Sequence, residues 1–214
     1  MVGLDINSES KIESVINNLL PVLHKDYFSN VLSNIHEDLR DNLSHSDYSM
    51  LLTKLNYSDG EVEKYIAKFI FYPEFEGLRD EYFIKLKNFP IIRNKIYNLW
   101  LVRNSKKEIF KISQRYIKRV KWHIYRLYRT RNSIVHAGKV GYGLQMLGEH
   151  LHIYVDAVIT DIVTKLALKN NLQTINDVLL DAKLILINIE KAFNNDNNIT
   201  DEDVELLCRD IIYI

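Results

Sequence analysis

Apolar side chains recur at steps of three and four residues along most of this 214-residue chain, and polar side chains lie between them. This spacing predicts amphipathic helices that pack together through their apolar sides. With only 7 glycines and 3 prolines, the chain lacks the turn residues that strand-rich folds need. We therefore predict an all-α fold. The expected helices cover residues 8–20, with a pause near Pro21, and 26–43, 48–55, 59–71, 90–103, 105–136, 144–168 and 174–193, with a short helix or a helical turn in 74–89 and a last helix after Thr200.

The longest uninterrupted pattern covers residues 105–136, where apolar or aromatic side chains follow the helical steps throughout. Three glycines, Gly138, Gly141 and Gly143, then supply a stop and a turn. The next pattern, residues 144–168, is strongly apolar. We expect these two helices to pack antiparallel to each other.

The best candidate for a domain boundary is the interruption around residues 72–76, which contains Pro73. We predict an N-terminal helical extension in residues 1–75 and a helical domain in residues 76–214, although the two parts also fit one compact unit. The hydrophobic content of 47% is enough to fill a core.

Cysteine content and hydropathy bear on the compartment. The single cysteine, Cys208, excludes an internal disulfide and agrees with a reducing setting. No apolar run approaches the roughly 18 residues that span a bilayer, and the first ten residues carry acids where a signal peptide has a basic start. We expect a soluble, cytoplasmic protein that does not bind membranes.

The formal net charge is zero, but the charges are segregated along the chain. Residues 1–81 carry 15 acids and 7 bases, residues 82–169 carry 4 acids and 18 bases, and residues 170–214 carry 9 acids and 3 bases. A basic centre predicts a surface for a polyanion. The alternative is that the acidic helices pair with the basic ones inside the fold.

The basic centre also contains aromatic residues. From Arg103 to Arg131 there are 11 Lys or Arg and a single acid, Glu108, with Tyr116, Trp122, Tyr125 and Tyr128 among them. Basic side chains can follow a phosphate backbone while aromatic rings stack on unpaired bases. Alternatively, the lysines form a solvated face and the tyrosines belong to the core.

Arg131 occupies an unusual position in the predicted long helix. At about 100° per residue it lies within roughly 20° of Val120, in the middle of the apolar stripe. A buried guanidinium costs several kcal/mol unless it is paired, so Arg131 needs an acid, a phosphate or a partner subunit. A core ion pair with Glu149, Asp156 or Asp161 is one interpretation.

His136 lies in the last turn of the same helix, about 140° from Arg131. The two side chains therefore do not converge within one helix, but two copies related by a two-fold axis can bring them together. The negative end of the helix dipole favours a protonated imidazole, which suits proton transfer near neutral pH. The plainer interpretation is a cation that caps the helix.

The stretch Leu-Tyr-Arg-Thr-Arg-Asn-Ser-Ile-Val-His-Ala-Gly at residues 127–138 resembles the signature of HEPN domains, most closely the Apea-like branch found in bacterial defence proteins. The signature is Arg, a polar residue, three variable residues and His. The resemblance covers roughly residues 76–195 and implies an all-α helical bundle of HEPN type with extra N-terminal helices.

The resemblance further implies a metal-independent endoribonuclease that works as a homodimer without a cofactor. The RNA 2′-hydroxyl would attack its neighbouring phosphorus and leave a 2′,3′-cyclic phosphate and a 5′-hydroxyl. His136 would transfer protons, Arg131 would stabilise the phosphate charge, and Asn132 would orient the phosphate or the histidine. We assign RNA contacts to the basic and aromatic positions Arg119, Arg126, Tyr128, Arg129 and Lys139.

The implied setting is bacterial defence or toxin activity, with a possible regulatory or sensor domain or partner protein. The alternatives are a catalytically silent HEPN module that binds RNA or dimerises, and a purely structural helical domain. Gly138 stands where HEPN toxins paired with nucleotidyltransferase antitoxins carry a modified tyrosine, so that route of regulation is not implied. His150 and His152 are two apart on a predicted helix and point to different sides, which argues against a metal site.

Overall fold

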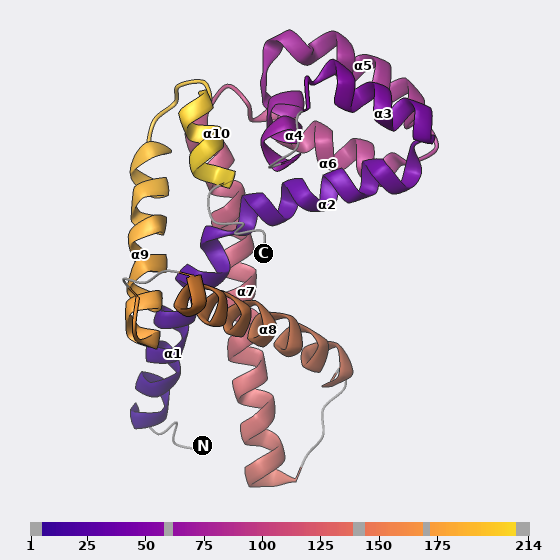
Figure 1. Cartoon of the computed structure of the whole chain (residues 1–214). Helices are drawn as coiled ribbons and strands as arrows, with labels where there is room; N and C mark the ends of the chain where they lie inside the picture. Colours follow the sequence, from indigo (N-terminus) through magenta and orange to yellow (C-terminus); the bar gives the residue numbers. More distant parts are fainter. Residues whose placement is uncertain (1–5, 58–61, 139–143, 169–171, 209–214) are drawn as a thin grey trace. The chain divides into compact units, whose positions relative to one another are not determined.

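The computed structural model describes residues 6–57, 62–138, 144–168 and 172–208. Every regular element in these ranges is a helix and none is a strand, which confirms the all-α prediction (Figure 1). The elements are α1 (Ile6–Lys25), α2 (Tyr27–Asn42), α3 (His45–Lys54), α4 (Val62–Phe71), the 3-10 helix η1 (Pro73–Phe75), α5 (Glu76–Lys85), α6 (Pro90–Leu101), α7 (Lys106–Ala137), α8 (Leu144–Leu168), α9 (Ile175–Ala192) and α10 (Asp201–Cys208).

Most helix bounds lie close to the predicted ranges. The N-terminal helix differs, because α1 does not end near Pro21 but continues through it to Lys25. Val22 and Leu23, in the turn that follows the proline, are both buried in a hydrophobic core. Their packing holds this turn helical despite the proline.

Three helices begin at hydrogen bonds exchanged between a Ser or Thr and an Asp three residues later. The pairs are Ser44 with Asp47 at α3, Thr174 with Asp177 at α9, and Thr200 with Asp203 at α10. Each hydroxyl accepts a backbone N–H that the first helical turn leaves without a partner. These short polar side chains therefore set where the helices start.

The chain divides into two compact units, each built from separate stretches of sequence. The first unit comprises Met1–Lys25 and Ser113–Ile187, and the second comprises Asp26–Ile112 and Asn188–Ile214. The boundary predicted near residue 75 falls inside the second unit and coincides with neither division. The helices α7 and α9 each contribute residues to both units.

The second unit has a core made mainly by α2, α4 and α6. Buried Phe28, Leu32 and Ile35 of α2 belong to this core together with Phe69 and Ile70 of α4. Its Arg79 is also buried, and the guanidinium Nη1 donates to the carbonyl oxygens of Phe69 at 2.6 Å and Tyr72 at 2.8 Å. The arginine thus satisfies the Phe69 carbonyl, for which Pro73 has no N–H to donate, and it joins the Phe75 N–H as a donor to the Tyr72 carbonyl.

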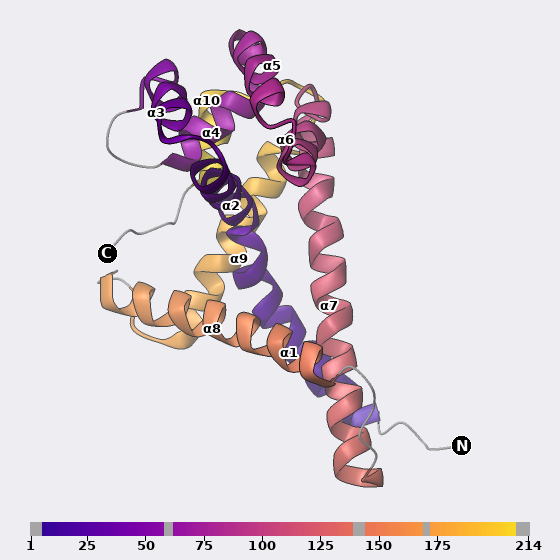
Figure 2. The same ribbon diagram turned by 90° about the vertical axis from the view of Figure 1, so that its right-hand side faces the viewer.

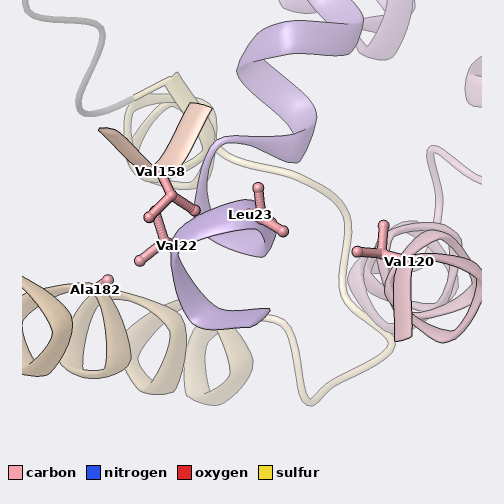
Figure 3. Packing of buried hydrophobic residues seen from close by; sticks show 5 residues of the cluster. All are labelled: Val22, Leu23, Val120, Val158 and Ala182. Carbon is pink, nitrogen blue, oxygen red and sulfur yellow. The ribbon is translucent and has the colours of Figure 1, made fainter. Parts of the chain in front are cut away.

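The first unit is held together by a smaller core. Val22 and Leu23 of α1, Val120 of α7, Val158 of α8 and Ala182 of α9 are all buried there (Figure 3). These five residues come from four helices, so each helix of the unit contributes to one shared cluster. Burial of such side chains is the main favourable contribution to folding.

A chain of charges reinforces this core. The Lys25 ammonium lies 3.0 Å from Asp161, and Lys165 lies 2.6 Å from Asp181 and 3.9 Å from Asp161. The side chains of Lys25 and Lys165 are nearly inaccessible to solvent. Each buried ammonium therefore has a carboxylate next to it, which offsets the unfavourable desolvation of the charge.

The arrangement of α7 and α8 differs from the predicted antiparallel pair. The two views show α8 crossing α7 steeply (Figures 1 and 2). The cause lies in α8 itself, whose apolar residues are spread around the helix so that no single stripe can lie along α7. Contact is confined to the region around the crossing, and much of α8 extends away from α7 (Figure 2).

Candidate functional site

The Arg131 to His136 hexad forms the last turns of α7. Gly138 follows with a φ of +60°, a left-handed conformation that glycine adopts without a steric penalty, and its N–H donates to the Ile134 carbonyl at 3.0 Å. The helix therefore ends at Ala137, one residue after His136. This position leaves the imidazole exposed near the free carbonyls at the helix end.

Arg131 has an exposed side chain and borders an apolar surface. Its Nη1 donates to the amide oxygen of the adjacent Asn132 at 3.1 Å. In the part of the chain that the structure describes, Arg131 forms no ion pair. The three carboxylates considered as its partners are bonded elsewhere: Glu149 to Gln145, Asp156 to His152 and Asp161 to Lys25.

The apolar surface beside Arg131 is a groove of about 660 Å³ within the first unit. Three helices, α1, α7 and α8, form its walls. Its lining is almost wholly apolar, and Arg131 is the one charged residue among those lining it in the described ranges. Representative lining residues are Leu19 and Leu23 of α1, Leu127 and Ile134 of α7, and Leu147, Leu151, Val155 and Ile159 of α8.

Large apolar side chains are exposed along much of α8. Seven of its large apolar side chains are between 42% and 60% exposed. A helix that is apolar on all sides is normally covered on all sides. No helix in the described ranges has the combination of length and apolarity that crossing a membrane requires. The exposed residues are Met146, Leu151, Ile153, Val155, Ile159, Val163 and Leu168.

His136 does not line the groove, and within the described residues no hydrogen bond or ion pair connects it to Arg131. The two side chains lie on different sides of α7, as the helical geometry predicts. A single copy of the chain therefore does not bring the hexad's arginine and histidine together.

The basic character of α7 persists in the folded chain. Lys111 pairs with Glu108 at 2.5 Å, and Lys121 approaches Glu13 at 3.6 Å. The remaining Lys and Arg between residues 113 and 131 form no ion pair with any acid in the ranges that the structure describes. These unpaired cations are Arg115, Lys118, Arg119, Arg126, Arg129 and Arg131.

The five residues assigned to RNA contact are not all equivalent. Arg119 and Arg129 are exposed, and the Arg126 guanidinium lies 4.6 Å from the ring centre of Trp122. Tyr128 instead lines the apolar groove. Lys139 falls outside the residues that the structure describes.

A cluster that the sequence did not reveal lies between α7 and α8. The rings of His123 and His150 are stacked, with centroids 4.5 Å apart, and His123 Nδ1 lies 2.9 Å from the Tyr154 hydroxyl. Burial, together with the positive charges of His150, Arg126 and Arg119, lowers the pKa of His123. The only signal in the sequence was the spacing of Arg119, His123 and Arg126 along one side of a helix.

His150 and His152 point in different directions, as their spacing on a helix predicts. His150 stacks on His123, whereas His152 Nε2 lies 3.2 Å from Asp156 in the next turn of α8.

Comparison with known proteins gave no match to any family model, curated protein or solved structure.

Proposed function

We propose that this chain is a cytoplasmic, metal-independent endoribonuclease of HEPN type that acts as a homodimer in bacterial defence or as a toxin. The observation that carries the proposal is the position of the Arg131 to His136 hexad. It ends a long basic helix, and its arginine has no ion-pair partner in the described residues and borders an exposed apolar groove.

The groove and the exposed side of α8 support a second copy as the missing partner. Covering apolar surface is the main driving force for association, and most soluble homo-oligomers are two-fold dimers. In a two-fold dimer the same surface of each copy covers the other. Such a dimer would bring the ends of two α7 helices together, so that Arg131 of one copy meets His136 of the other.

The chemistry follows from these two groups. The imidazole of His136 accepts the proton of the RNA 2′-hydroxyl, whose oxygen then forms a bond to the adjacent phosphorus. The bond from phosphorus to the 5′-oxygen breaks, and a protonated imidazole supplies the proton that the leaving oxygen needs. Arg131 stabilises the growing charge on the non-bridging oxygens. The 3.1 Å bond to Asn132 holds the guanidinium in place for this role.

Cleavage of single-stranded RNA of random sequence in EDTA tests the proposal. We expect the wild type to produce fragments with 2′,3′-cyclic phosphate ends, identified by mass spectrometry. Arg131→Ala and His136→Ala should each lose about 10²- to 10⁴-fold in rate, the usual contribution of such groups. His152→Ala, which removes an exposed histidine of α8, serves as the matched control and should retain the wild-type rate.

Equal cleavage by the wild type and both variants would exclude the assigned roles. A second candidate function is a silent module that binds RNA without cutting it, and the separation of Arg131 from His136 within one chain favours it. RNA binding by a wild type that leaves the RNA intact in the same assay would select this candidate.

A further inference from the structure

We propose that His123 and His150, together with Arg119 and Arg126, form a second phosphate-binding site that takes the backbone of single-stranded RNA when the imidazoles are protonated. This inference rests on the proposed function only for the identity of the polyanion. The site itself is separate from the Arg131 to His136 hexad and involves none of its residues.

The cluster is built on two helices, α7 and α8. Arg119, His123 and Arg126 are spaced at i, i+4 and i+7 on α7 and share one side of the helix. His150 from α8 stacks on His123 at 4.5 Å. Two helices thus bring four groups that carry or can gain a positive charge into one place.

None of these four side chains has an ion-pair partner in the parts of the chain that the structure describes. The nearby acids have other partners. Glu13 accepts a hydrogen bond from the Tyr125 hydroxyl and lies near Lys121. Glu149 accepts a hydrogen bond from Gln145 at 3.3 Å. A phosphate would supply the negative charge that the cluster lacks.

The groups that face His123 decide how the site responds to pH. They are Arg119 and Arg126 on α7, and His150 and Tyr154 on α8. Burial and the neighbouring cations hold the pKa of His123 below its ordinary value, which favours the neutral imidazole when no anion is bound. A bound anion favours the charged form and raises that pKa. Binding is therefore coupled to proton uptake and strengthens as the pH falls.

An aromatic ring beside the cluster favours RNA over a free phosphate ion. Trp122 is 55% exposed and lies under the Arg126 guanidinium at 4.6 Å, and its ring centre is 5.6 Å from that of His123. An exposed indole next to bound phosphate offers a surface on which an unpaired base stacks. The site thus matches one nucleotide unit, with its phosphate on the cations and its base on Trp122.

The test measures binding of a fluorescent oligouridylate by anisotropy, at constant salt and in EDTA, in a His136→Ala protein that cannot cut the RNA. Between about pH 7.5 and about pH 5.5 we expect affinity to rise about tenfold, which corresponds to a shift of about one unit in one imidazole pKa. A His123→Gln, His150→Gln double variant should lose most of this rise. His152→Gln on the same helix should keep it, and Trp122→Ala should bind more weakly at both pH values.

A pH response in the double variant equal to that of its parent would overturn the proposal. The proposal would also be overturned if inorganic phosphate binds at the cluster but the parent and the double variant bind RNA with the same affinity. If the double variant fails to fold, the imidazole resonances of the parent followed by NMR decide, because bound RNA must raise the pKa of His123. If the wild type cuts RNA but its RNA affinity does not depend on pH through these histidines, the second site is rejected and the nuclease proposal stands. If the affinity shows this pH dependence but no RNA is cut, the second site stands and the nuclease proposal is rejected.

Discussion

At the scale of single residues, the exposure and contacts of Arg131 explain how a cation can lie in the apolar stripe of α7. The sequence placed it correctly among apolar neighbours, because helical spacing fixes which residues share a side. It did not reveal that those neighbours line an open groove, since exposure depends on where α1 and α8 pack. The guanidinium is consequently exposed and free of any acid in the described residues, so the interpretation as a paired core arginine has lost its support.

The stacked pair of His123 and His150 was beyond prediction for a related reason. The two residues belong to different helices, and nothing in the spacing within either helix indicates that they meet. Only the crossing of α7 and α8 brings the rings to 4.5 Å.

A third histidine, His24, gives a prediction for stability. It is buried, its Nε2 lies 2.9 Å from the Ser113 hydroxyl, and burial lowers its pKa to about 4. The unfolded chain has the ordinary histidine pKa of about 6.5 and therefore binds more protons than the folded chain between these values. The free energy of unfolding should fall, by up to about 3 kcal/mol from this group, as the pH decreases from about 6.5 to about 4.

Urea denaturation across this range measures the effect. His24→Gln should flatten the dependence of the unfolding free energy on pH, because glutamine does not titrate. The number of protons taken up on unfolding, which sets this slope, should fall by up to one. The exposed His45 of α3 offers a control, and His45→Gln should leave the slope as it is in the wild type. An unchanged slope in His24→Gln would mean that the pKa of His24 is the same in the folded and the unfolded chain.

At the scale of elements, the helices follow from the sequence far better than their packing does. Periodicity and capping pairs such as Thr200 with Asp203 are local properties, and they located most helices to within a few residues. The crossing of α8 over α7 is not local, because α8 has apolar residues on several sides and each side offers a possible contact. Only the packing of Val158 against the shared core selects one of them.

The exposed side of α8 yields a prediction about association. Ile159 lines the groove and is 54% exposed, so Ile159→Lys places a charge in the surface proposed to meet a second copy. We expect the wild type to have twice the 25.2 kDa mass of one chain, and the variant to sediment as a monomer with RNA cleavage lost.

Thr160→Lys provides the control for this experiment. Thr160 is exposed on the same helix but does not line the groove, so the added charge should leave the mass at that of a dimer. A monomeric wild type that still cuts RNA would exclude the shared site.

At the scale of the whole molecule, some of the charges segregated along the chain form ion pairs and others do not. Acids of the chain do pair with bases, as Lys106 does with Asp203 at 2.7 Å and Lys25 with Asp161 at 3.0 Å. The cations along α7 from Arg115 to Arg131 are largely left over. Pairing of acids with bases therefore accounts for some of these residues, and a polyanion surface on α7 stays a prediction.

The leftover cations predict a strong dependence of RNA binding on salt. Each phosphate contact with single-stranded nucleic acid contributes a slope of about −0.7 to the logarithm of affinity against the logarithm of salt concentration. Arg119→Gln should therefore make the measured slope less negative by about 0.7. Lys87→Gln, which removes an exposed cation between α5 and α6, should leave the slope unchanged. Equal slopes for the wild type, Arg119→Gln and Lys87→Gln would mean that RNA does not contact Arg119.

The shared core of the first unit also has a consequence for synthesis. Val22 cannot complete its packing until the ribosome has delivered Ala182, which is most of the chain later. At about 5–20 residues per second this delay lasts on the order of 10 to 30 seconds. During that time α1 lacks its packing partner from α9, so the first unit cannot reach its native packing before α9 has been synthesised. A nascent chain that stalls before α9 would therefore expose the apolar side of α1 that this core otherwise covers.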